Sequence, residues 1–405
     1  MEIIPVRTGE PLLIQAGWVL DGTGGPPLRN AVIRIEGGII RSVSSAPPHS
    51  APDPPGPPDG SGEKFYDLSG CTVLPGLIDC HVHLALDSRD FARSVRRWEN
   101  PAACLALIED QLADTLAAGV VAVRDGGDRH LLASGAVGTG RRLPEVIPTG
   151  FALRAKGKYG SFLGPGLDSV SLPSAVAHLA AKGFRQVKVL ASGIVGFKEY
   201  GQVGPQQFDR RGLEDICRAA RGLGLKVMAH ASSDGAVRAA VLAGADSIEH
   251  GYFLTKETLA LMAGKNVAWV PTIVPVAVRL TGSFRQSHSP EELVIIERVV
   301  RRQQEMATQA YELGVRVGAG TDAGAAGVRH GLSFVDELKL LLAGGLPISQ
   351  VIRAATANAA AITGTSGAPG VIEPGREANL IAVRGDLVGN IDLLRKPAFL
   401  FSRFL

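Results

Sequence analysis

The chain has 405 residues, of which 45% are hydrophobic and 20% are charged, so it can bury a large core. Its formal net charge is +3 and no basic run stands out, which argues against a nucleic-acid partner. No segment reaches the roughly 18 uncharged apolar residues of a membrane helix, the N-terminus lacks a signal-peptide pattern, and the four cysteines form no Cys-x-x-Cys pair. We therefore expect a cytoplasmic protein without a membrane partner.

The N-terminal 70 residues predict part of a small β domain. Residues 11–45 alternate apolar and polar side chains, with turn signals at Asp21-Gly22 and Gly37-Gly38, which is typical of short antiparallel strands. Residues 47–58 are rich in proline and predict an exposed loop. Residues 64–68 predict one more short strand.

From Thr72 onward, short apolar runs alternate with helical stretches, as expected of βα units and a parallel sheet. In residues 209–223, for example, apolar side chains recur at helical spacing. The eight apolar runs lie near 73–80, 120–124, 146–149, 186–190, 225–229, 246–249, 267–271 and 315–320. Eight βα repeats match a closed (β/α)8 TIM barrel.

The C-terminal tail returns to strand character at residues 379–383, between turns at Pro374-Gly375 and Gly385-Asp386. We expect it to pair with the N-terminal strands. The predicted fold is therefore α/β, with a TIM barrel over residues 71–368. A small β-sandwich domain is predicted from residues 1–70 and 369–405.

Two histidines, His81 and His83, close the first apolar run. Because side chains alternate along a strand, both point to the same side, and the active sites of barrels lie where strands end. Histidines so placed form a metal clamp. A pair of core or surface histidines is the alternative at this spacing.

Lys188 interrupts the apolar run of the fourth predicted strand. A lysine that snorkels from an edge strand is the alternative, but a closed barrel has no edge. Burial costs a charged lysine free energy and so favours the neutral amine. A neutral amine can add carbon dioxide and become a carbamate, which is an anionic oxygen ligand.

Three further candidates follow later strands. His230 ends the fifth run, His250 ends the sixth, and Asp322 follows the eighth among small residues. Taken singly, the histidines are also consistent with hydrogen-bonded core residues and the aspartate with a cap. Their common place at strand ends favours metal ligation.

These motifs resemble the amidohydrolase superfamily, in particular its imidazolonepropionase-like and prolidase-like branch with two metals. The resemblance covers nearly the full length, and its motifs occur in the expected order: Leu74-Pro-Gly-Leu-Ile-Asp-Cys-His-Val-His83, Gly119-Val-Val-Ala-Val-Arg-Asp125, Ala243-Gly-Ala-Asp-Ser-Ile-Glu-His-Gly251, Gly320-Thr-Asp-Ala-Gly324 and Gly370-Val-Ile-Glu-Pro-Gly375.

The resemblance implies two divalent metal ions held by His81, His83, Lys188, His230, His250 and Asp322. In this scheme His81, His83 and Asp322 bind one metal, and Lys188, carbamylated by carbon dioxide, bridges it to the other. Zinc is the expected metal, and the ligand types also admit manganese or iron. A metal-bridging hydroxide would attack the scissile carbonyl, and Asp322 would pass its proton to the leaving nitrogen.

Substrate contacts are predicted on two loops. Relatives of the prolidase type carry a histidine after the third strand, where this chain has Gly157-Lys-Tyr-Gly160, so Tyr159 is a candidate replacement. His330, which precedes a glycine in the last loop, is a second candidate. The alternative for His330 is a loop histidine bonded to backbone. Ser232 stands where such relatives often carry an aromatic residue or a histidine, which weakens a dipeptidase assignment.

We predict a hydrolase of an amide-type C–N bond in a small molecule such as a dipeptide, an N-acyl amino acid or a cyclic amide. A hydrolase of lactones, carbamates or phosphoesters with the same site is the first alternative. A deaminase with one metal is the second, although it would not need Lys188. A catalytically silent structural member is the third, although the chain keeps all six ligands. We also expect a homo-oligomer.

Overall fold

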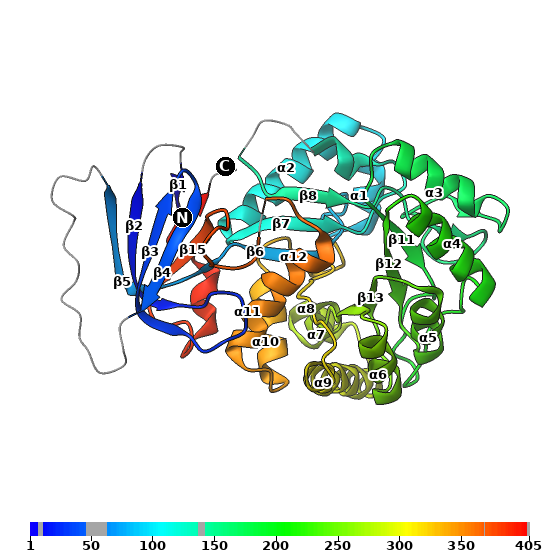
Figure 1. Cartoon of the computed structure of the whole chain (residues 1–405). Helices are drawn as coiled ribbons and strands as arrows, with labels where there is room; N and C mark the ends of the chain where they lie inside the picture. Colours follow the sequence, from blue (N-terminus) through cyan, green and yellow to red (C-terminus); the bar gives the residue numbers. More distant parts are fainter. Residues whose placement is uncertain (7–10, 46–62, 137–141, 368, 403–405) are drawn as a thin grey trace.

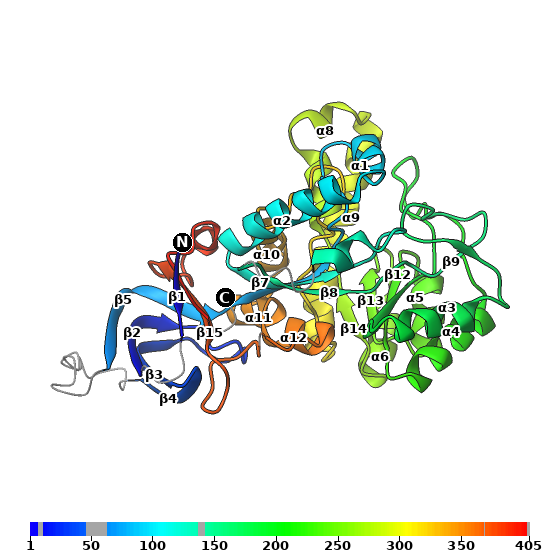
Figure 2. The same cartoon turned by 90° about the horizontal axis from the view of Figure 1, so that it is seen from above.

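The computed structural model describes residues 1–6, 11–45, 63–136, 142–367 and 369–402. Strands from both ends of the chain form a sheet at one end of the molecule, and parallel strands with their helices form the rest (Figures 1 and 2). The proline-rich stretch predicted as a loop, residues 47–58, lies outside the described residues.

A seven-stranded sheet joins the two ends of the chain in the order β1-β16-β15-β5-β2-β3-β4. Its strands are β1 (Glu2–Pro5), β2 (Leu12–Val19), β3 (Leu28–Glu36), β4 (Ile39–Ser45), β5 (Lys64–Pro75), β15 (Asn379–Arg384) and β16 (Phe399–Ser402). The antiparallel pairs β2–β3 and β3–β4 confirm the predicted antiparallel strands, and the pairing of β15 with β5 confirms the predicted return of the tail. A second sheet packed on this one is not assigned among the described residues, so the sandwich stays a prediction, as do the domain boundaries.

The middle of the chain supplies two parallel sheets with the orders β6-β7-β8 and β11-β12-β13-β14. Their strands are β6 (Leu77–Val82), β7 (Val120–Asp125), β8 (Glu145–Pro148), β11 (Gln186–Leu190), β12 (Lys226–Ala231), β13 (Ser247–His250) and β14 (Ala268–Val270); β9 (Arg154–Ala155) and β10 (Gly166–Leu167) form a separate pair. Nearly every residue of the seven parallel strands is buried, which explains why they appear in the sequence as continuous apolar runs.

Helices follow the parallel strands and cover them on the outside, as α3 to α6 do for β11–β13 (Figures 1 and 2). The α-helices are α1 (Phe91–Arg97), α2 (Pro101–Ala117), α3 (Leu172–Ala181), α4 (Arg210–Gly222), α5 (Asp234–Ala243), α6 (Lys256–Gly264), α7 (Val274–Ala277), α8 (Gly282–Gln286), α9 (Pro290–Glu312), α10 (Phe334–Ala343), α11 (Ile348–Ala354) and α12 (Ala357–Thr363). The 3-10 helices are η1 (Leu132–Ala136), η2 (Val278–Leu280) and η3 (Ile391–Arg395).

The longest helix, α9, begins at a capping box that is visible in the sequence. The Ser289 side chain accepts from the Glu292 backbone N–H, and the Glu292 carboxylate accepts in return from the Ser289 backbone N–H. This capping box satisfies two backbone donors, and Pro290 fits the first helical turn, where its missing N–H costs nothing.

Seven of the eight predicted apolar runs coincide with parallel strands, and the eighth does not form a regular strand. In residues 315–320 only Val317 forms a bridge, to Trp269 of β14. Two glycines interrupt this run, and the Val317 carbonyl accepts from the Asn358 side chain instead of continuing a ladder. The first run also differs, because residues 73–75 end β5 and Gly76 separates them from β6.

The two largest apolar cores among the described residues lie under these sheets. One contains the inner side chains of the parallel strands and the helices around them. The other contains side chains of the seven-stranded sheet, drawn from both ends of the chain. None of the described helices is both long and apolar enough to cross a membrane.

Candidate metal centre

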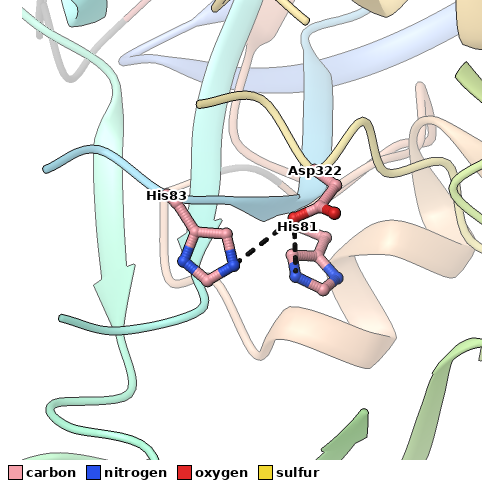
Figure 3. Close-up of side chains that lie close together, drawn as sticks. All are labelled: His81, His83 and Asp322. Carbon is pink, nitrogen blue, oxygen red and sulfur yellow. Dashed lines mark ion pairs between the residues drawn. The ribbon is translucent and has the colours of Figure 1, made fainter. Parts of the chain in front are cut away.

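The end of β6 delivers two histidines to one side of the sheet (Figure 3). His81 is fully buried and His83 is 7% exposed. Cys80, which precedes His81, and Val82, which lies between the two histidines, pack into the apolar core. The predicted alternation is therefore confirmed. Nδ1 of His81 donates to Oε2 of Glu249 at 3.0 Å, and Nδ1 of His83 donates to the Gly127 carbonyl at 3.2 Å.

Asp322 meets both histidines from the far end of the sequence. Its Oδ1 lies 3.4 Å from Nε2 of His81 and 3.4 Å from Nε2 of His83, as the dashed lines of Figure 3 mark. One ligand atom from each of the three residues lies within 4.8 Å of the other two. The Asp322 backbone N–H donates to the His81 carbonyl at 2.7 Å, which ties the loop to β6. This group can hold a divalent cation.

Lys188 of β11 is 1% exposed, and its Nζ lies 3.1 Å from Nε2 of His81. Among the described residues no carboxylate lies within 4.0 Å of Nζ. Burial lowers the pKa of Lys188 to about 8, although the charges of Glu249 and Asp322 oppose this shift. The structure thus places a lysine amine, without a paired carboxylate, beside the metal-binding group.

His230 and His250 end β12 and β13, and their ring centroids lie 4.5 Å apart. Nε2 of His230 donates to the Gly193 carbonyl at 3.3 Å. Nδ1 of His250 lies 2.7 Å from the Thr272 hydroxyl, and that hydroxyl donates to the Pro271 carbonyl, so it accepts from the histidine. The His250 ring centroid lies 5.1 Å from that of His81, which joins this pair to the first group.

The outer hydrogen bonds fix the tautomer of all four histidines. In each ring one nitrogen donates outward to a carbonyl, a carboxylate or a hydroxyl, so the other nitrogen carries a lone pair. Burial, together with the Lys188 charge, lowers the pKa of His83 and His230 to about 3. The rings are therefore neutral, as metal ligands must be, and the donor set fits divalent cations.

Backbone strain marks the same strand ends. His250, Thr272 and Asp322 have φ values of 71°, 47° and 57°, in the left-handed region that non-glycine residues rarely adopt. Such strain persists where the surrounding structure imposes it, and it gathers at functional sites. The Thr272 hydroxyl accepts a hydrogen bond from His250, so this strained residue orients the His250 ring.

A buried network behind His81 was not anticipated from the residues themselves. Arg124 of β7 donates to Oε1 of Glu249 at 2.8 Å, and the Ser247 hydroxyl donates to the same oxygen at 2.6 Å. Arg124 also donates to the Cys80 carbonyl at 2.6 Å. The sequence does contain a signal for this ion pair, because Arg124 and Glu249 each lie inside an apolar strand. Charged residues are rarely buried unless they are paired.

A cavity of about 250 Å3 opens above these side chains, and its lining includes His83, Lys188, His230, His250 and Asp322. It can take a small molecule. Tyr159 also lines it, and its ring lies 5.9 Å from that of His230. Arg154, in contrast, donates to three carbonyls of the loop that carries Tyr159, so it holds that loop in shape.

His330 lines a second cavity beside the first. Its Nε2 lies 3.3 Å from the Leu86 carbonyl, and its buried Nδ1 has no partner among the described residues. A substrate contact from His330 stays a prediction.

Comparisons with known proteins agree with this geometry. The family model described as "Amidohydrolase family" matches residues 72–404. An uncharacterised protein of Mycobacterium tuberculosis is 29% identical over 74% of this chain and 75% of its own length. Ochratoxinase of Aspergillus niger is 26% identical over 95% of this chain and 83% of its own length. Imidazolonepropionase of Sphingopyxis alaskensis is 25% identical over 85% of this chain and 86% of its own length.

Solved structures share the whole fold. A Xaa-Pro dipeptidase with methionine bound in its active site superimposes with a TM-score of 0.81 and 26% identity, covering 98% of this chain and 99% of that one. Because the family model spans most of the sequence, the chain belongs to the amidohydrolase family and is a hydrolytic enzyme acting on carbon–nitrogen bonds.

Proposed function

We propose that this enzyme hydrolyses an amide-type C–N bond of a small molecule with the help of two divalent cations. The observation that carries the proposal is the meeting of His81, His83 and Asp322, whose ligand atoms lie within 4.8 Å of one another below the cavity. Relatives named dipeptidase, ochratoxinase and imidazolonepropionase favour an amide among the bonds that such a site can hydrolyse.

One cation would be held by His81, His83 and Asp322, and the other by His230 and His250. Lys188 would bind both cations as a carbamate. The carbamate forms when the neutral amine of Lys188 adds carbon dioxide and releases a proton. Support comes from its burial, from the 3.1 Å between its Nζ and Nε2 of His81, and from the lack of a carboxylate within 4.0 Å among the described residues.

When bound, the cations would polarise the scissile carbonyl and lower the pKa of a water molecule. Asp322 is the residue suited to carry the proton from this water to the leaving nitrogen. Its side chain is 18% exposed and lines the cavity, so it can reach a group bound there. A carboxylate in this position can accept a proton from one bound group and return it to another.

We also infer that the two parallel sheets belong to one eight-stranded barrel. Isolated parallel bridges support this, because Leu153 pairs with Val189 of β11, and Trp269 of β14 pairs with Val317. Ala323, after the eighth run, pairs with Val82 of β6. A closed barrel explains why side chains from β6, β11, β12 and β13 meet at one face.

The test is metal removal and reloading with a substrate panel of dipeptides, N-acyl amino acids, cyclic amides, lactones and aryl carbamates. A chelator should abolish hydrolysis of at least one amide, and Zn2+ or Mn2+ should restore it. Full amide hydrolysis by chelator-treated protein without bound metal would refute the metal part of the proposal. Turnover of lactones or carbamates alone would refute the amide part.

A further inference from the structure

The cavity above the metal centre has a mainly apolar wall. Side chains from α1, from the loops after β9 and β11, and from α7 contribute to it, among them Phe91, Phe162, Ile194, Phe197 and Val276. Phe91 is 53% exposed and Ile194 is 52% exposed, so the apolar wall reaches the surface. Large exposed apolar side chains at a cavity favour a substrate with an apolar or aromatic group.

Charged groups in this cavity are unevenly distributed. Its acidic lining residues are Asp322, which belongs to the metal centre, and Asp90, whose side chain caps α1 by accepting from the Arg93 backbone N–H at 3.0 Å. Its basic lining residues are Arg89, Lys188 and Arg279. The described lining therefore offers no uncommitted carboxylate to a cationic substrate, but it does offer guanidinium groups to an anion.

Arg279 of η2 is the cation best placed to bind such an anion. It is partly buried, and among the described residues no carboxylate lies within 4.0 Å of it and no acceptor takes a hydrogen bond from its guanidinium. Its guanidinium carbon lies 5.2 Å from the centroid of the Phe197 ring, which fixes its position. A partly desolvated guanidinium with free donors binds a carboxylate in a bidentate manner.

Arg279 lines the same cavity as Tyr252, whose ring contacts a histidine of the proposed metal centre. The Tyr252 ring stacks on that of His250 with centroids 5.5 Å apart and 17° between the planes. The Tyr252 and Arg279 side chains both line the cavity. His250, Tyr252 and Arg279 therefore face the same cavity, which also contains the other side chains of the metal centre.

We propose that Arg279 is the receptor for a substrate carboxylate, and that the enzyme prefers amides that carry one carboxylate beside an apolar or aromatic group. This inference rests on the proposed amide hydrolysis and names its substrate class. Basic dipeptides should be poor substrates, because the described lining has no free acid for them.

Arg279 could instead act only as a link between η2 and the loop of Phe197, and a matched variant separates the two roles. Arg298 of α9 lies 3.6 Å from the centroid of the Tyr200 ring, so it makes the same kind of contact with the same loop. Arg298 does not line the cavity. Arg298→Met therefore removes a comparable contact and leaves the cavity unchanged.

The first measurement is calorimetric binding to the purified, metal-containing protein, with 3-phenylpropanoate and its neutral amide, 3-phenylpropanamide, as probes. Arg279→Met should weaken binding of the anion about 10- to 100-fold, the range for a hydrogen bond to a charged group, and leave the neutral probe unchanged. Arg298→Met should bind both probes as the native protein does. Comparing variants of equal metal content separates Arg279 from any carboxylate binding by the metals.

The inference fails if Arg279→Met binds both probes normally, if it loses both equally, or if the native protein binds neither. Kinetics supply a second arm, with N-acetyl-L-phenylalanine and its carboxamide as substrates. Arg279→Met should lower kcat/KM mainly through KM for the acid, and the carboxamide should be unaffected. If no amide of the substrate panel is hydrolysed while the binding arm succeeds, the proposed reaction fails and the anion site stands.

Discussion

Lys188 is the residue on which the proposed chemistry depends most. A lysine that is 1% exposed normally requires a paired acid, because burial penalises its charge. Here its described neighbour at hydrogen-bond distance is the ring of His81. An unpaired charge at this place would be costly, whereas a carbamate would turn the lysine into a useful anion.

Truncation of Lys188 tests this interpretation. Lys188→Ala should lose paired metal binding and activity while the protein still folds, because the other ligands remain but no group serves both cations. Added acetate or propionate should partly restore both, since a short carboxylate can enter the vacated space. Metal analysis, turnover and circular dichroism measure these outcomes.

Lys226 of β12 provides the control. Its Nζ donates to the Ala361 carbonyl at 2.7 Å, away from the histidines, so Lys226→Ala should retain its metal. Two metals and full activity in Lys188→Ala without added acid would rule out the carbamate.

The sequence predicts the six proposed metal ligands but not the residues that orient them. The histidines were visible because they end apolar runs, and strand alternation set the direction of His81 and His83. The partner of each ring was hidden, because Glu249 and Thr272 reach the histidines only after distant strands come together. The left-handed backbone at Thr272 likewise has no signature in a threonine.

At the scale of elements, the turn after β7 controls how closely the chain approaches the histidines. A Cβ added to Gly126 would lie 2.6 Å from Cε1 and 3.0 Å from Nε2 of His83. Glycine is therefore required at position 126 because the His83 ring lies so close, and not because of the conformation of the turn. The sequence shows a glycine at this place but not the ring it must avoid.

Gly126→Ala should displace the His83 ring and lower metal content and kcat, with a smaller effect on folding. Gly135→Ala is its control, because an added Cβ there meets only Leu105 Cδ1, at 4.0 Å. Elemental analysis and thermal unfolding of both variants decide the matter. Equal metal content in the two would show that His83 tolerates the shift and is not a tightly held ligand.

The order of elements was largely predictable, and the reason is burial. Strands covered on both faces appear as apolar runs, so seven of the eight runs were located correctly. The eighth run has apolar residues as well, but Gly318 lies against Ile362, where an added Cβ would stand 2.5 Å from Cδ1. Glycine is therefore needed for this close packing, and composition alone does not reveal it.

At the scale of the whole molecule, stability should depend on pH through buried carboxyls outside the metal centre. Glu337 of α10 is fully buried and accepts from the backbone N–H groups of Ile273 and Val274, at 3.0 and 2.7 Å. Burial raises its pKa from 4.5 to about 8 in the folded chain. Its contribution to stability is therefore complete below about pH 4.5 and is lost as the pH rises through 8.

Between pH 6.5 and 8 the folded chain keeps this proton and the unfolded chain does not. The free energy of unfolding should then fall with pH by up to about 1.4 kcal/mol per pH unit from this group. Glu337→Gln should reduce the slope of the free energy of unfolding against pH by up to that amount. Glu312 is exposed, so Glu312→Gln should leave this slope unchanged. Denaturant unfolding across this range measures the slopes, and identical slopes in all three proteins would contradict a buried proton on Glu337.

The proposed enzyme requires two cations at one face of the fold, and anomalous X-ray diffraction from crystals of the zinc-loaded protein measures them most directly. We expect two anomalous peaks, one in contact with His81, His83 and Asp322 and one in contact with His230 and His250. Electron density for a carbamate should extend Lys188 between them. A single peak, or peaks away from these five residues with an unmodified Lys188, would contradict the proposed metal centre.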